Sequence, residues 1–117
     1  MKLDKALRLL QALYNKNQTV IDESVMAPDV KDWINLTVRH DSSHGVEHFT
    51  CLTVASYNSD VGTVRQLVKA GCDVRASNSY GRTPLQIACL SNVDVNSKVV
   101  FLLERDPSLC IDVGTVV

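Results

Sequence analysis

The chain has 117 residues, of which 45% are hydrophobic and 21% charged, and its formal net charge is −1. This length and apolar content fit one globular domain with a continuous core and argue against a disordered chain. The balanced charge, without a dense Lys/Arg block, argues against nucleic acid as a partner, and no apolar run approaches the ~18 residues of a membrane span. We therefore expect neither nucleic-acid nor membrane binding.

The first predicted element is an amphipathic helix over residues 3–16. Its apolar residues recur at helical spacing, and they are Leu3, Ala6, Leu7, Leu10, Leu13 and Tyr14. The polar run at 15–17 ends it. Charges such as Arg8 interrupt this stretch, so it does not fit a secretory signal, and we expect a cytoplasmic or nuclear protein.

Residues 18–44 form the least regular part of the chain. Residues 19–26 fit a second short helix that breaks before Pro28, and residues 29–34 fit another helical turn. We expect Trp33 to anchor this segment. Residues 36–39 alternate apolar and polar side chains like a strand.

Two similar strings follow, residues 50–57 and residues 83–90, at an offset of 33. In each, a Thr suited to an N-cap precedes an apolar run, and in the second Pro84 occupies the first helical position. Leu85, Ala88 and Cys89 then share one helical face. Two short helices with such narrow apolar faces must stack to bury them.

A longer helix is predicted after each of these strings. Asp60 is a candidate N-cap for the first, and Gly71 supplies its C-terminal turn. The second covers residues 95–105 and follows an insertion of two residues around 92–96; Pro107 ends it. Its predicted apolar face consists of Val95, Val99, Leu102 and Leu103.

The string Thr83-Pro84-Leu85 and the period of 33 resemble the ankyrin repeat, whose signature is T-P-L-H-x-A. Thr53 and Gln86 replace the His of that signature, and Cys51 replaces the Pro in the first copy. The resemblance implies an all-α ankyrin-repeat solenoid of stacked helix-turn-helix units with hairpin loops. Its predicted division is a divergent N-terminal repeat at 1–44, repeats at 45–77 and 78–113, and a tail at 114–117.

The resemblance also implies a function, which is non-catalytic binding of another protein as a scaffold, regulator or substrate receptor. Hairpin tips and the concave face of the short helices would carry the contacts. The positions matched to these features are Val46, Glu47, Phe49, Tyr57, Asn58, Ser79, Tyr80, Arg82, Leu90 and Ser91. An alternative for Phe49 and Tyr57 is packing under the segment 27–44.

Two other functional interpretations stay open. The chain can be a stacking or self-associating part of a longer ankyrin-repeat protein, with the 95–105 helix as the contact, or a module attached to an enzyme such as a ubiquitin ligase or kinase. The sequence itself holds no phosphate-binding loop or catalytic motif, so we expect no enzyme activity and no cofactor.

The histidines and cysteines raise the question of a metal. His40, His44, His48 and Cys51 have the side chains that zinc prefers, but their spacing is wider than that of structural zinc sites. We therefore interpret them as hairpin residues, with zinc as the minor alternative and no metal expected. The four cysteines at 51, 72, 89 and 110 form no C-x-x-C pair, and we expect reduced packing residues.

Overall fold

The structure is a computed structural model that describes residues 2–42 and 45–105. The described part contains helices and one strand pair, with these bounds in chain order: α1 Lys2–Asn15, α2 Gln18–Val25, α3 Val30–Trp33, β1 Val38–Ser42, β2 Gly45–Phe49, α4 Cys51–Asn58, α5 Val61–Lys69, α6 Pro84–Leu90 and α7 Val95–Arg105. None of these helices is long and apolar enough to cross a membrane.

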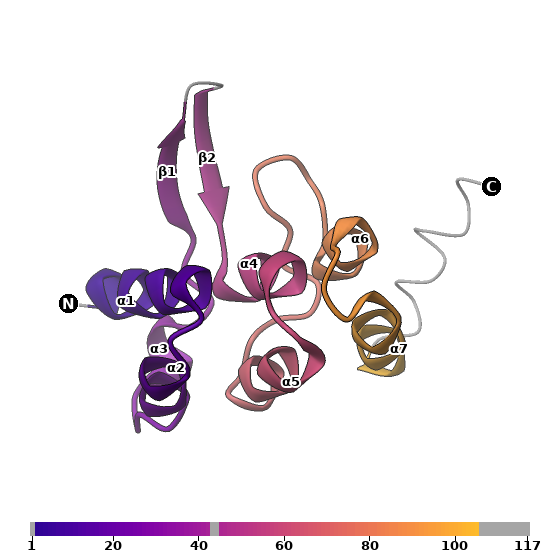
Figure 1. The fold of residues 1–117 in the computed structure, drawn as a ribbon. Helices are drawn as coiled ribbons and strands as arrows, with labels where there is room; N and C mark the ends of the chain where they lie inside the picture. Colours follow the sequence, from indigo (N-terminus) through magenta and orange to yellow (C-terminus); the bar gives the residue numbers. More distant parts are fainter. Residues whose placement is uncertain (1, 43–44, 106–117) are drawn as a thin grey trace.

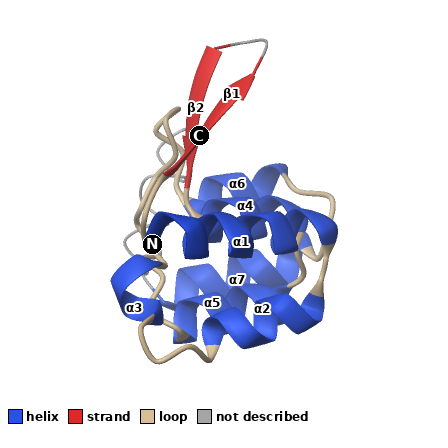
Figure 2. Ribbon diagram, turned by 90° about the vertical axis from the view of Figure 1, so that its left-hand side faces the viewer, coloured by secondary structure: helices blue, strands red, loops and turns tan. Residues whose placement is uncertain are grey.

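The helices form two rows. Helices α1, α4 and α6 lie one behind another in the first row, and α2, α5 and α7 form the second (Figure 1, Figure 2). Each first-row helix packs against its partner in the second, so three helix pairs are stacked. The predicted all-α architecture of stacked helix pairs is confirmed.

Helices α4 and α6 begin in the same way. Thr50 and Thr83 accept hydrogen bonds from the backbone nitrogens of Thr53 (3.2 Å) and Gln86 (3.3 Å). In return, the Thr53 hydroxyl and the Gln86 amide oxygen accept from the backbone nitrogens of Thr50 and Thr83. Both helices therefore have a complete capping box. Thr53 and Gln86, which stand where the ankyrin signature has His, form hydrogen bonds at the N-termini of their own helices.

The three first-row helices share one pattern, Leu-x-x-Ala-x-Tyr/Leu. Its three copies are Leu9-Ala12-Tyr14, Leu52-Ala55-Tyr57 and Leu85-Ala88-Leu90. Every Leu at the first position and every Ala is buried, whereas the last residue of each copy is exposed. Leu52 and Leu85 are each 1% exposed, so the two predicted copies occupy equivalent environments.

Helix α5 follows its predicted boundaries closely. The Asp60 carboxylate accepts a hydrogen bond from the Thr63 nitrogen at 3.0 Å, which makes Asp60 the N-cap. Gly71 has φ +117°, a conformation that favours glycine, directly after the helix. The start of α5 is also bonded to the next unit. The Asp94 carboxylate, from the loop before α7, accepts a hydrogen bond from the Val61 nitrogen at 2.9 Å.

The irregular segment contains more structure than its sequence predicts. Strand β1 begins two residues later than predicted and pairs antiparallel with β2, from Val38 opposite Phe49 to Ser42 opposite Gly45. This hairpin projects from the helical rows (Figure 1) and spans the predicted boundary at residue 44. The segment before β1 is anchored by Trp33, which is buried as predicted.

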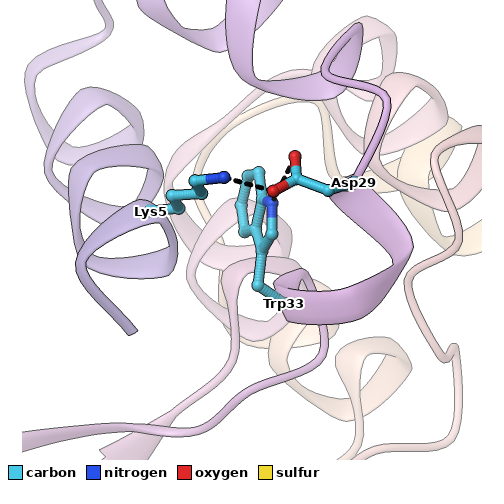
Figure 3. A network of polar contacts seen from close by, with 3 residues as sticks. All are labelled: Lys5, Asp29 and Trp33. Carbon is cyan, nitrogen blue, oxygen red and sulfur yellow. Dashed lines mark hydrogen bonds and ion pairs between the residues drawn. The ribbon is translucent and has the colours of Figure 1, made fainter. Parts of the chain in front are cut away.

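The Asp29 carboxylate contacts both Trp33 and Lys5 of α1. The Trp33 indole nitrogen donates to Asp29 at 3.3 Å, and Lys5 forms an ion pair with the same carboxylate (Figure 3). Both hydrogen bonds hold the pKa of Asp29 below its ordinary value, with Lys5 the larger cause. This contact fixes the irregular segment against the first helix.

Cys89 differs from its prediction because it is exposed. The equivalent residue one unit earlier, Ser56, is buried because α7 of the following unit covers it. In the described residues no further unit follows α7 to cover Cys89 in the same way. Cys51 and Cys72 are buried, as expected of packing residues, and Cys110 lies outside the described residues.

Lys98 is the largest departure from the predicted apolar face of α7. It is 0% exposed, and its ammonium donates to the Ser56 carbonyl at 2.6 Å and to the Ser91 hydroxyl at 2.9 Å. Ser91 donates in turn to the Tyr57 carbonyl at 2.6 Å. Burial lowers the pKa of Lys98, and the carboxylates of Asp94 and Asp60 partly oppose this. We call Ser56, Ser91 and Lys98 the Lys98 cluster; it joins α7 to α4.

Removing the buried ammonium should destabilise the protein. Lys98→Met keeps the aliphatic part of the side chain but leaves the Ser56 carbonyl without its donor, so we expect a loss of about 1–3 kcal/mol in the free energy of unfolding. Urea unfolding followed by circular dichroism measures this. Lys2→Met, at an exposed position, is the matched control and should change stability by less than about 0.5 kcal/mol. Equal effects of the two substitutions would contradict the role assigned to Lys98.

Asp29 should make stability depend on pH. Its pKa is lowered in the folded protein from an ordinary value of 3.8, so its contribution is present above that value and is lost as the pH falls through the lowered pKa. We expect Asp29→Asn to be less stable than the wild type at neutral pH, and we expect this difference to shrink as the pH falls below 3.8 through the lowered pKa. Fluorescence of Trp33, the single tryptophan, reports the unfolding. A stability difference that is constant across this pH range would contradict the assignment.

Candidate functional site

A groove runs along the exposed end of the first-row helices and has a volume of about 260 Å³. We call it the tyrosine groove, because all three tyrosines of the chain line it. Its lining comes from α1, β2, α4, α6 and the loop between α5 and α6, and it consists of Tyr14, Phe49, Thr53, Val54, Tyr57, Asn78, Tyr80, Arg82, Ile87 and Leu90.

The stacking of the helices places the floor of this groove. Tyr14, Tyr57 and Leu90 end the three copies of the Leu-x-x-Ala-x-Tyr/Leu pattern, so the stacking of those copies sets them in a row. Their exposed fractions are 53%, 54% and 54%. Tyr80, from the loop, is 59% exposed. Four large apolar side chains therefore gather at one site while about half of each remains in contact with solvent.

The loop between α5 and α6 is shaped by Asn78. The Asn78 amide oxygen accepts from the backbone nitrogens of Tyr80 (3.0 Å) and Arg82 (3.1 Å), and Gly81 has φ +76°. This loop rises on the same side as the β-hairpin (Figure 1). The turn therefore presents Tyr80 and Arg82 at the rim of the groove.

The loop is also bonded to β2 of the preceding unit. The Ser79 nitrogen donates to the His48 carbonyl at 3.2 Å, and the Ser79 hydroxyl accepts from the His48 nitrogen at 3.1 Å. The Tyr80 hydroxyl donates to the Glu47 carboxylate. These three contacts join the rims of two successive repeats.

Glu47 raises the pKa of two tyrosine hydroxyls. Its hydrogen bond to Tyr80 is the largest cause that raises the pKa of that hydroxyl, and Arg82 opposes the shift. Burial raises the pKa of Tyr14, with the Glu47 charge as the second cause. Both hydroxyls are therefore protonated at neutral pH and available as hydrogen-bond donors or acceptors.

Five of the predicted contact residues line the groove together: Phe49, Tyr57, Tyr80, Arg82 and Leu90. Glu47 and Ser79 belong to the adjoining rim. Val46 lies in β2, but its side chain is outside the described residues. Phe49 is half-buried and packs against the core, so part of its side chain serves packing, the alternative considered for it above. Tyr57 is exposed, so that alternative does not describe it.

Two predicted contacts have structural roles instead. Ser91 is buried in the Lys98 cluster, where its hydroxyl is occupied by Lys98 and by the Tyr57 carbonyl, so its prediction as a groove contact is wrong. Asn58 is half-buried and donates to the Leu13 carbonyl at 3.0 Å, which links α4 to α1.

Sequence reasoning missed five of the groove residues, and they are Tyr14, Thr53, Val54, Asn78 and Ile87. Tyr14 carried a usable signal, because it ends a Leu-x-x-Ala-x-Tyr string like that of Tyr57. The offset between these two strings is 43 instead of 33, since the irregular segment lengthens the first unit. A search at one fixed period does not detect it.

The geometry weakens the zinc alternative. The Cys51 thiol is buried, donates to the Ala6 carbonyl at 3.7 Å, and has its pKa raised by burial to about 12. It therefore belongs to the core, whereas His48 is exposed. The side chains of His40 and His44 lie outside the described residues. Within the described ranges, no group of three His, Cys, Asp or Glu side chains is placed to hold a metal ion.

Comparison with known proteins agrees with this architecture. The family model for ankyrin repeats, in three copies, matches residues 8–111. The tyrosine-protein kinase HTK16 of Hydra vulgaris is 29% identical over 85 residues, which cover 73% of this chain and 10% of the kinase. The cyclin-dependent kinase 4 inhibitor B of Mus musculus is 36% identical over 64 residues, which cover 55% of this chain and 48% of the inhibitor.

The inhibitor of Rattus norvegicus matches to the same extent as that of the mouse. The chain thus spans about a tenth of the kinase and about half of the inhibitors. No solved structure matches the chain significantly.

Proposed function

This chain belongs to the ankyrin-repeat family, and we propose on that premise that it is a non-catalytic module that binds another protein through the tyrosine groove. Ankyrin repeats are protein–protein interaction modules. The observation that carries the proposal for this groove is that all three tyrosines of the chain, drawn from three different elements, line it with about half of each side chain exposed.

Tyrosine suits this role for physical reasons. It buries a large area at a low cost in conformational entropy, because its side chain has two rotatable angles, and its hydroxyl can stay hydrogen-bonded after burial. Arg82 adds a charged group of the type enriched among the residues that dominate binding energy. Four of the six aromatic residues of the chain lie here, and the tryptophan is in the core.

The size of the groove favours a protein segment over a cofactor. Pockets for small ligands typically enclose about 300–1,000 Å³ and bury most of the ligand. The tyrosine groove encloses about 260 Å³ and is continuous with the exposed rim of two loops. We propose that apolar side chains of a partner enter between the tyrosine rings while its polar groups meet Arg82 and the hydroxyls.

The relatives support this class of function without identifying the partner. One is named an inhibitor of cyclin-dependent kinase 4, and in the other the similar stretch is a tenth of a tyrosine-protein kinase. The name of each relative refers to a protein kinase, in one case as the protein that is inhibited and in the other as the protein that contains the similar segment. We therefore propose a regulatory or scaffolding role, with a protein kinase as the first class of partner to test.

The groove residues should control binding without controlling stability. Tyr57→Ala, Tyr80→Ala and Arg82→Glu change exposed side chains, so each should alter the free energy of unfolding by about 0.5 kcal/mol or less. Each should also weaken partner binding by about tenfold or more, since a central aromatic or Arg contact contributes about 2 kcal/mol. Quantitative affinity purification with the intact chain, followed by titration of the captured partner, measures this.

The matched control is Leu7→Ala, which removes an exposed apolar side chain of α1 outside the groove. It should leave partner binding unchanged. If Leu7→Ala and Tyr57→Ala weaken binding equally, or if the groove variants fail to fold, the groove is not the binding surface.

A second candidate function is self-association through α7. The observation that favours it is Val100, a large apolar side chain that is 54% exposed on this helix. Light scattering at increasing protein concentration should then show a dimer that Val100→Glu abolishes, because a buried, unpaired charge opposes the contact. A monomer at every concentration, for the wild type and the variant alike, excludes this candidate.

A further inference from the structure

A second hollow lies between α5 and α7. These helices belong to the second row, away from the first-row helices that line the tyrosine groove (Figure 1). Its volume is about 540 Å³. We call it the basic trough and define it by its lining, which is Arg65, Val68, Lys69, Phe101, Glu104 and Arg105.

The trough concentrates positive charge. It holds three cations, Arg65, Lys69 and Arg105, and one carboxylate, Glu104, although the whole chain has a net charge of −1. In the part of the chain that the structure describes, none of these three cations forms an ion pair. The cations of α1 differ, since Lys5 pairs with Asp29 and Arg8 pairs with Glu23.

Two of the cations are held in place by one aromatic ring. The guanidinium carbons of Arg65 and Arg105 lie 5.6 Å and 5.0 Å from the centre of the Phe101 ring, within the range of cation–π contacts. A guanidinium that contacts a ring keeps N–H groups available for a carboxylate, which it can bind through two parallel hydrogen bonds. Holding two like charges beside one ring also favours an anionic group that neutralises them.

The floor of the trough is apolar. Phe101 is buried beneath the two arginines, and Val68 is half-buried on α5. Along α7 the exposed side chain of Val100 extends this apolar surface in a neighbouring hollow, which shares Arg65, Phe101 and Glu104 with the trough. A ligand that fits here combines carboxylates with apolar side chains.

We propose that the basic trough binds an acidic peptide segment of a protein. Its carboxylates would meet Arg65 and Arg105, with Lys69 as a third contact, and an apolar side chain would lie over Val68. Three cations on a chain of net negative charge are few for a nucleic acid or an anionic membrane, whose binding grows with the number of phosphates neutralised. This surface is separate from the tyrosine groove, because the two share no lining residue.

Fluorescence polarisation tests the proposal with a short fluorescein-labelled peptide of alternating Glu and Leu, beside a matched peptide of Gln and Leu. We expect the Glu peptide to bind the intact chain at least about tenfold more tightly, and Arg65→Gln with Arg105→Gln to remove most of this difference. The matched control is Lys2→Gln with Lys16→Gln, which changes the net charge equally at exposed positions outside the trough and the tyrosine groove and should retain binding. Circular dichroism confirms that each variant is folded.

Glu104→Gln provides an independent measurement with the opposite sign. It removes the carboxylate of the trough without removing a cation, so it should tighten binding of the Glu peptide by about twofold or more. Equal affinity for the Glu and Gln peptides overturns the proposal, as does an unchanged affinity in the Arg65/Arg105 variant. Tighter binding of single-stranded RNA or of phosphatidylserine vesicles than of the Glu peptide also overturns it. Tyr57→Ala should not affect this peptide, which separates a failure here from a failure of the tyrosine groove.

Discussion

The packing of the three first-row helices through their buried Leu and Ala side chains is the contact on which the architecture depends. Each first-row helix places a buried Leu and a buried Ala at the same positions, and the middle helix packs on both neighbours. A larger side chain at Ala55 would separate α4 from its neighbours, because adding methylenes to a packed core forces the backbone to shift. Small residues here therefore set the spacing of the stack.

That spacing also produces the site. Tyr14, Tyr57 and Leu90 follow their alanines by two residues, so the same stacking that buries Ala12, Ala55 and Ala88 aligns the exposed side chains beside them. The rim is then closed by the hydrogen bonds of the loop tip to β2. Core and groove are consequently two sides of one repeated pattern, to which β2 adds Phe49 and the loop between α5 and α6 adds Asn78, Tyr80 and Arg82.

Local chemistry explains what could be predicted from the sequence. The caps at Thr50, Thr83 and Asp60 and the turn at Gly71 depend on neighbouring residues, and all four are where their sequence places them. Five groove residues are predicted in a different way, by matching them to the hairpin tips and the short-helix face of the ankyrin repeat. The repeat boundaries at 44 and 77 stay a prediction.

What could not be predicted depends on contacts between units. Ser91 and Cys89 look alike in sequence as small residues at the end of α6, yet Ser91 is buried by Lys98 and Cys89 is exposed. The burial of Lys98 depends on two acceptors outside its own helix, the Ser56 carbonyl on α4 and the Ser91 hydroxyl after α6. The same cluster ties the Tyr57 carbonyl to Ser91. The Lys98 cluster therefore fastens α4, which carries Tyr57 of the groove, to α7, which carries Phe101 of the trough.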